Sequence, residues 1–174
     1  MKIVVLNGSP RKGGNTEQMA EHFAEAARKK HDVQILNVGR MNIHGCLGCG
    51  SCYKHQGACV QKDDMQQVFD ALQDADMVVF ASPIYWFDLT AQLKAAIDRL
   101  YAGGSTGFHF HQTALLLDAG ADHVFTAAIA QYQAMTSYLR WEDRGIITVP
   151  NMEEKGSIAA SPKLADVAAL AESL

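Results

Sequence analysis

A glycine-rich segment near the N-terminus carries the residue types that bind a phosphate group. It follows a short apolar run at residues 2–6 and contains Ser9 and Thr16, whose hydroxyls form hydrogen bonds, and Arg11, a fixed positive charge. Its glycines let the backbone point N–H groups inward, and the helical pattern that follows adds the free N–H donors of a first turn. The segment predicts a phosphate site at a strand-to-helix junction, although an ordinary glycine-rich turn would also fit.

The spacing of the glycines excludes the two commonest nucleotide motifs. A triphosphate-binding loop ends in Gly-Lys-Ser/Thr, whereas Gly13 is followed here by Gly14 and Asn15. A dinucleotide fingerprint reads Gly-x-Gly-x-x-Gly, but Gly8 is followed by Ser9-Pro10-Arg11. The phosphate is therefore expected to belong to another kind of ligand.

A second candidate segment follows the apolar run at residues 76–81. It contains Tyr85, Trp86 and Phe87 in succession, and such aromatic side chains either close a core or form the wall against which a flat ring lies. A third segment, residues 118–121, follows another apolar run. Flavin mononucleotide (FMN) has one phosphate at one end and a planar ring at the other, so it matches the first two segments taken together.

The elements that must position these segments alternate between strand and helix. Five parallel strands separated by helices predict a doubly wound, three-layer α/β sandwich with the flavodoxin-like strand order 2-1-3-4-5, folded as a single domain over residues 1–174. In that order, the segments after the first and third strands border one crevice, where such sheets bind ligands. Strands are predicted at residues 2–6, 33–38, 76–81, 113–117 and 145–149, and helices at about 16–30, from 65, from 89, at 124–141 and from 162.

Several motifs together resemble a known family. The chain is similar to the NAD(P)H-dependent FMN reductase family of flavodoxin-like proteins, and in particular to its iron–sulfur flavoprotein branch, from residue 2 to about 150. The motifs that carry the resemblance are Gly8-Ser9-Pro10-Arg11-x-x-Gly14-Asn15-Thr16, Pro83-Ile84-Tyr85-Trp86, Gln92-Leu93-Lys94, Asp98-Arg99, and Cys46-x-x-Cys49-x-x-Cys52 leading to Asp63-Asp64-Met65.

The resemblance implies a cofactor, a reaction and an assembly. Hydride would pass from NAD(P)H to bound FMN and on to a free flavin, a quinone or another small-molecule acceptor, and no acid–base side chain of the protein would be required. Members of the family are usually homodimers or homotetramers. The FMN-binding residues that the resemblance implies are Ser9, Arg11, Gly14, Asn15, Thr16, Pro83, Ile84, Tyr85, Trp86, Ala119, Gly120 and Ala121.

Four cysteines lie close together in the sequence, which in a reducing compartment indicates a metal or redox role. Cys46, Cys49 and Cys52 are separated by two residues each, as at the start of a ferredoxin run, but Cys59 follows after six residues instead of three. The resemblance allows this longer gap and implies a 4Fe–4S cluster. A zinc site with four thiolate ligands and four free thiols remain open alternatives.

The composition limits the partners and the compartment. Fifteen basic and nineteen acidic side chains give a formal net charge of −4 without a basic stripe, which argues against nucleic acid or a membrane as the main partner. No stretch approaches the ~20 apolar residues that span a bilayer, and the N-terminus enters a strand where a signal peptide would lie. We therefore expect a cytoplasmic protein.

Three functions are compatible with these patterns. The leading expectation is an FMN-dependent oxidoreductase that uses NAD(P)H. The alternative is an iron–sulfur flavoprotein that carries single electrons between protein partners. A non-flavin regulator or phosphate-binding module on the same fold is the third, because a fold alone does not specify a function.

Overall fold

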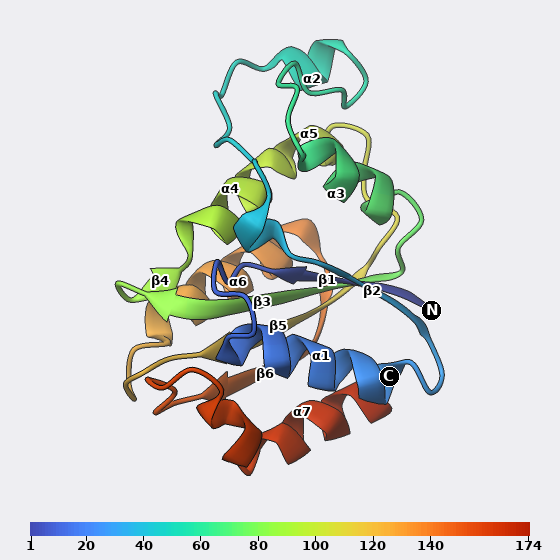
Figure 1. The fold of residues 1–174 in the computed structure, drawn as a ribbon. Helices are drawn as coiled ribbons and strands as arrows, with labels where there is room; N and C mark the ends of the chain where they lie inside the picture. The colour runs from blue at the N-terminus through green and yellow to red at the C-terminus, as the bar shows by residue number, and fades with distance from the viewer.

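The apolar runs of the sequence form a parallel sheet between two layers of helices (Figure 1). A computed structural model describes residues 1–174. The strands are β1 (Lys2–Asn7), β2 (Asp32–Leu36), β3 (Met77–Tyr85), β4 (Asp88–Leu89), β5 (Gln112–Asp118) and β6 (Glu142–Val149). The helices are α1 (Asn15–Ala27), α2 (Ser51–Lys54), α3 (Met65–Leu72), α4 (Ala91–Arg99), α5 (Tyr101–Gly104), α6 (Thr126–Leu139) and α7 (Lys163–Glu172), with 3-10 turns η1 (Val38–Arg40) and η2 (Ser157–Ala160).

The predicted flavodoxin-like class is confirmed. The parallel strands lie in the order β2-β1-β3-β5-β6, which is the predicted order 2-1-3-4-5 when β4 is set aside. Because β1 and β3 are neighbours in register, with Leu6 opposite Phe80 and Asn7 opposite Ala81, the loops that follow them start side by side.

The sheet has six strands, so the predicted count of five is wrong. β3 extends to Tyr85, and the chain turns at Trp86 and Phe87 to pair antiparallel with β4. Both turn residues have positive φ (49° and 69°), as the two central residues of a type I′ hairpin turn require. Asn and Gly usually occupy such positions, and two aromatic residues gave no turn signal. The sequence therefore predicted a loop here and a helix that already included Leu89.

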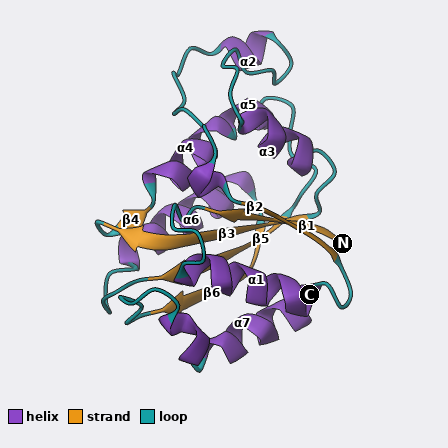
Figure 2. Ribbon diagram, viewed as in Figure 1, coloured by secondary structure: helices purple, strands orange, loops and turns teal.

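Alternate residues of the central strands face two apolar cores, one on each side of the sheet. Val4 and Leu6 belong to the core covered by α3, α4 and α6, whereas Ile3 and Val5 belong to the core covered by α1 and α7. Figure 2 shows the two helical layers on opposite faces of the strands. Burial on both faces explains why β1 and β3 consist almost entirely of apolar residues.

None of the helices combines the length and the apolarity that a bilayer crossing requires.

A close backbone approach fixes the start of the predicted phosphate loop. Gly39, in η1, packs so tightly on this loop that a Cβ atom added to it would lie 2.4 Å from the backbone carbonyl atoms of Ser9 and 2.5 Å from the carbonyl oxygen of Gly8. Backbone cannot rotate away as a flexible side chain can. The turn at residues 38–40 therefore packs against the loop backbone and limits where the loop can lie.

We expect Gly39→Ala to lower the free energy of unfolding by about 1–3 kcal/mol, the usual cost of overpacking a dense interior. Urea unfolding of the purified variant measures this. The matched control is Gly104→Ala in α5, where the added Cβ meets nothing within 4 Å, and it should leave the stability unchanged or raise it slightly. Equal stabilities of the two variants would contradict the account.

Candidate functional site

Hydrogen bonds hold the loop between β1 and α1 against the neighbouring elements. The Gly8 N–H donates to the Ala81 carbonyl of β3 (2.8 Å), and the Thr90 hydroxyl donates to the Gly8 carbonyl (2.8 Å). The Ser9 N–H donates to the side-chain oxygen of Asn7 (3.0 Å), which turns the chain out of the strand. The loop is therefore set in position by β3 and by the residue that caps α4.

The N-terminus of α1 opens onto this loop without a side-chain cap. The first-turn N–H groups of a helix have no partner within the helix. Gly14, at the N-cap position, has no side chain that could accept hydrogen bonds from them. The nearby carboxylate of Glu17 is paired with Arg40 (2.8 and 3.2 Å), and the hydrogen bond from Arg40 is the main cause that lowers its pKa. Free donors and the helix dipole make this end of α1 suited to an anion.

A cavity of about 240 Å³ lies at the carboxyl ends of the strands, where the loops after β1, β3 and β5 meet. It brings together ten of the twelve residues predicted to bind FMN. Trp86, at the hairpin turn with 93% of its surface exposed, and Ala121 lie outside the lining. The ten are Ser9, Arg11, Gly14, Asn15, Thr16, Pro83, Ile84, Tyr85, Ala119 and Gly120.

Four residues of the lining are not among the twelve predicted to bind FMN, and three of them come from the segment after β6, which the sequence analysis missed. Asp118 is the last residue of β5, and Met152, Glu153 and Lys155 complete the wall. The one signal for this segment in the sequence is its place after the last predicted strand, at the same edge of the sheet as the loops after the other strands. Its basic residue, Lys155, adds a second cation to the cavity.

Asn15 ties this C-terminal segment to the start of α1. Its side-chain amide donates to the carbonyls of Met152 (3.0 Å) and Glu154 (2.9 Å), and its side-chain oxygen accepts from the Gly156 N–H (2.8 Å). These bonds occupy the side chain, so a ligand in the cavity finds the backbone N–H of Asn15 available instead. The residue predicted as a phosphate contact thus also builds the wall of the cavity.

Asp118 places a buried carboxyl group on the cavity wall. Burial raises its pKa to about 6, although the hydrogen bond from the Thr16 hydroxyl (2.5 Å) and the charge of Arg11 act in the opposite direction. Only 4% of the residue is exposed. The protonated form is therefore favoured by folding, and this group contributes stability below pH 4 that is lost as the pH rises through about 6.

We expect Asp118→Asn to be more stable than the wild type at pH 8, by at most about 3 kcal/mol, because the pKa difference between 3.8 and about 6 corresponds to that energy. The gap should shrink toward zero at pH 4. Urea unfolding of both ligand-free proteins at the two pH values measures it. A gap that is the same at pH 4 and pH 8 would show that the carboxyl group is not the cause.

The four cysteines lie on the segment between η1 and α3, which rises above α4 and α5 at the top of Figure 1. All four are free thiols, and all four line one small cavity that Arg99 also lines. No three His, Cys, Asp or Glu side chains lie close enough to hold one metal ion, as a zinc site requires. In a 4Fe–4S cluster each thiolate binds a different iron, so the sulfurs need not converge on one point.

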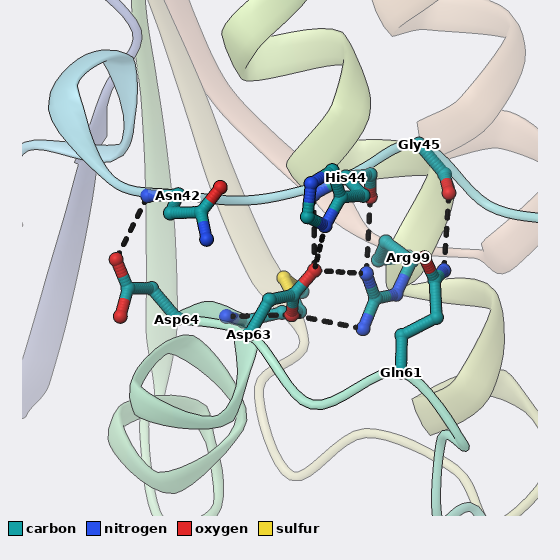
Figure 3. A network of polar contacts seen from close by, with 8 residues as sticks. Asn42, His44, Gly45, Gln61, Asp63, Asp64 and Arg99 are labelled. Atoms are coloured by element: carbon teal, nitrogen blue, oxygen red, sulfur yellow. Dashed lines mark hydrogen bonds and ion pairs between the residues drawn. The ribbon is translucent and has the colours of Figure 1, made fainter.

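An ion pair anchors the end of this cysteine segment to α4. Figure 3 shows Arg99 and Asp63 joined by two hydrogen bonds, of 2.7 and 3.1 Å, and the Arg99 guanidinium also donates to the His44 carbonyl (3.0 Å). Burial alone would raise the pKa of Asp63, but hydrogen bonds from Arg99 and from the His44 and Met65 N–H groups outweigh it and lower the pKa to about 2. Arg99 therefore binds both ends of the cysteine segment, through the His44 carbonyl near its start and through Asp63 near its end.

Comparison with known proteins assigns the family. Residues 1–152 match the model for NADPH-dependent FMN reductase. The chain belongs to this family. It is similar to an iron–sulfur flavoprotein of Archaeoglobus fulgidus, with 33% identity over 140 residues, 80% of this chain and 60% of that protein. A second one from the same organism is 28% identical over 161 residues, 91% of this chain and 80% of that protein.

Solved structures show the same fold at low sequence identity. NAD(P)H:quinone oxidoreductase from Methanothermobacter marburgensis superposes with a TM-score of 0.77 at 17% identity, covering 99% of this chain and 96% of that one. An FMN-dependent NADH-azoreductase from Bacillus anthracis, solved with FMN, gives 0.74 at 15% identity, covering 99% of both chains. Several of the curated relatives are longer, and this chain spans about half to three fifths of their length.

Proposed function

We propose that this protein is an FMN-dependent oxidoreductase that takes hydride from NAD(P)H and passes the electrons to a small-molecule acceptor such as a flavin or a quinone. The observation that carries the proposal is the cavity at the strand ends, which combines an uncapped helix N-terminus, Arg11 and Lys155 with the aromatic hairpin at Tyr85. Family membership and the names of the structural neighbours support it.

The size and polarity of the cavity suit the polar tail of FMN. Its volume of about 240 Å³ is below the roughly 300–1,000 Å³ of pockets that enclose a whole drug-sized ligand. In our proposal the phosphate takes the N–H groups of α1 together with Arg11 and Ser9, and the ribityl chain and ring follow Pro83–Trp86 and Ala119–Ala121. When bound, FMN would supply the hydride chemistry.

The residues of the chain would bind and orient the cofactor. Arg11 and the first turn of α1 offset the charge of the phosphate. Asp118, with its raised pKa, can hold a proton beside that phosphate and so avoid a repulsion between two anions. No side chain is needed as an acid or base for the hydride step, and we propose none.

A second candidate function rests on the cysteine segment. Four free thiols line one cavity, and several relatives bear the name iron–sulfur flavoprotein. The donor set fits a 4Fe–4S cluster, because its four irons take four thiolate ligands and four cysteines line this cavity. Cys46, Cys49, Cys52 and Cys59 would hold the cluster, which would supply one-electron transfer between protein partners.

Protein purified without air separates these functions. Flavin absorption with NAD(P)H oxidation above the uncatalysed rate, using benzoquinone or free FMN as acceptor, is the result expected of the enzyme. Additional broad iron–sulfur absorption with little NAD(P)H turnover would favour the carrier. A colourless protein that takes up no FMN would contradict both.

The assignment of Arg11 has its own test. Arg11→Gln should weaken FMN binding by roughly 10- to 100-fold, because a hydrogen bond to a charged group contributes about 1.5–3 kcal/mol. Quenching of flavin fluorescence on titration measures the affinity. Riboflavin, which lacks the phosphate, should bind both proteins alike, and Lys12→Gln, an exposed cation outside the lining, is the control. Equal losses for FMN and riboflavin would refute a phosphate contact.

A further inference from the structure

Arg99 is the largest fully buried side chain of the protein and lies beside the cysteine segment. It is the last residue of α4, with 2% of its surface exposed. Its two terminal nitrogens are occupied by Asp63 and by the His44 carbonyl, as Figure 3 shows. The guanidinium is thereby fixed in one orientation.

The third nitrogen of the guanidinium has no partner. Arg99 Nε is buried and makes no hydrogen bond in the structure. Such a buried donor costs free energy unless something accepts from it. Arg99 lines the cavity that the four thiols also line, and Cys59 is the one thiol of the four that acts on the guanidinium charge. A sulfur acceptor is therefore the nearest chemical match for the free N–H.

Anchoring the segment does not by itself require a charged pair. Burying an ion pair costs the hydration of both charges, and apolar residues of similar volume often serve a core equally well. The two carboxylate oxygens of Asp63 accept hydrogen bonds from Arg99, from the His44 N–H and from the Met65 N–H. These bonds fix the orientation of both side chains. A buried pair that leaves Arg99 Nε without a partner, in a cavity that the four thiols also line, is better explained by what those thiols bind.

We propose that Arg99 is a positioning residue for the iron–sulfur cluster, whose Nε–H donates a hydrogen bond to the Cys59 sulfur and thereby raises the reduction potential of the cluster. The inference rests on the proposed cluster. Asp63 contributes by fixing the guanidinium plane, so that the bond is already oriented when the cluster is assembled.

The physical reason is the change of charge on reduction. An added electron makes the cluster sulfurs more negative, and an N–H donor stabilises the reduced form more than the oxidised one. The neighbouring carboxylate of Asp63 offsets the positive charge of Arg99 at longer range, so the directed hydrogen bond is the main effect. Its loss should disfavour reduction without removing a ligand.

The test compares Arg99→Lys with the wild type after anaerobic reconstitution with iron and sulfide. Lysine keeps the charge and can still pair with Asp63, but it lacks the Nε–H of arginine. We expect equal iron content per chain and a reduced form destabilised by about tenfold, which is about 59 mV lower in midpoint potential for one electron. The potential is measured by redox titration followed by electron paramagnetic resonance. Lys94→Gln, a half-buried cation on the same helix that pairs with Asp98, is the control and should leave the potential unchanged.

Two different failures are distinguishable. A wild-type protein that takes up no iron while it binds FMN would overturn the cluster, and with it this inference, but would leave the proposed flavin enzyme intact. A loaded Arg99→Lys variant with the wild-type potential would overturn the role of Arg99 alone.

A measurement on the wild type covers the case in which the variant does not fold. With arginine labelled by nitrogen-15, the electron spin of the reduced cluster should show coupling to a nitrogen-15 nucleus transmitted through the hydrogen bond. Absence of that coupling in a fully loaded protein would contradict the proposal.

Discussion

The hydrogen bonds that join the β1–α1 loop to β3 and to α4 are the interaction on which the candidate cofactor site depends. Parallel pairing of β1 with β3 brings two loops to the same place, but it does not by itself fix their shapes. The bond from Gly8 to Ala81 continues the pairing one residue beyond the strand, and Thr90 then uses its hydroxyl for the Gly8 carbonyl and its N–H for the Ser82 hydroxyl. A single cap residue therefore locks both loops and starts α4.

The same helix connects the two candidate sites. α4 begins at the residue after Thr90, which holds the β1–α1 loop, and ends at Arg99, which holds the cysteine segment. Nine residues of helix span about 14 Å, so the two sites are separated by a rigid element of fixed length. This geometry suits a protein in which a flavin and a second redox centre keep a constant separation.

The sequence was informative where local pattern decides structure. Apolar runs predicted the five parallel strands, and their alternation with helices predicted the flavodoxin-like order, in which the ligand crevice lies between β1 and β3. The hairpin at Trp86 and Phe87 was missed, because aromatic residues at positive φ carry no turn signal and the turn is closed by the pairing of β3 with β4.

The chemistry of the site was less predictable than its position. Asp118 was assigned to a loop, whereas it ends β5 and points a carboxyl group at the cavity, where burial shifts its pKa. The contribution of Lys155 depends on Asn15, which binds the segment after β6 across more than 130 residues of sequence. Contacts of this range cannot be read from spacing or periodicity.

The central claim is that the loops after β1, β3, β5 and β6 form one FMN-binding crevice. Amide hydrogen exchange of the protein with and without FMN tests it directly, since a ligand seated in the crevice must slow exchange in all four loops. We predict protection in residues 8–16, 83–87, 119–121 and 152–156 together, with the helices of the opposite edge unchanged. Protection confined to one loop, or located elsewhere on the protein, would contradict the account.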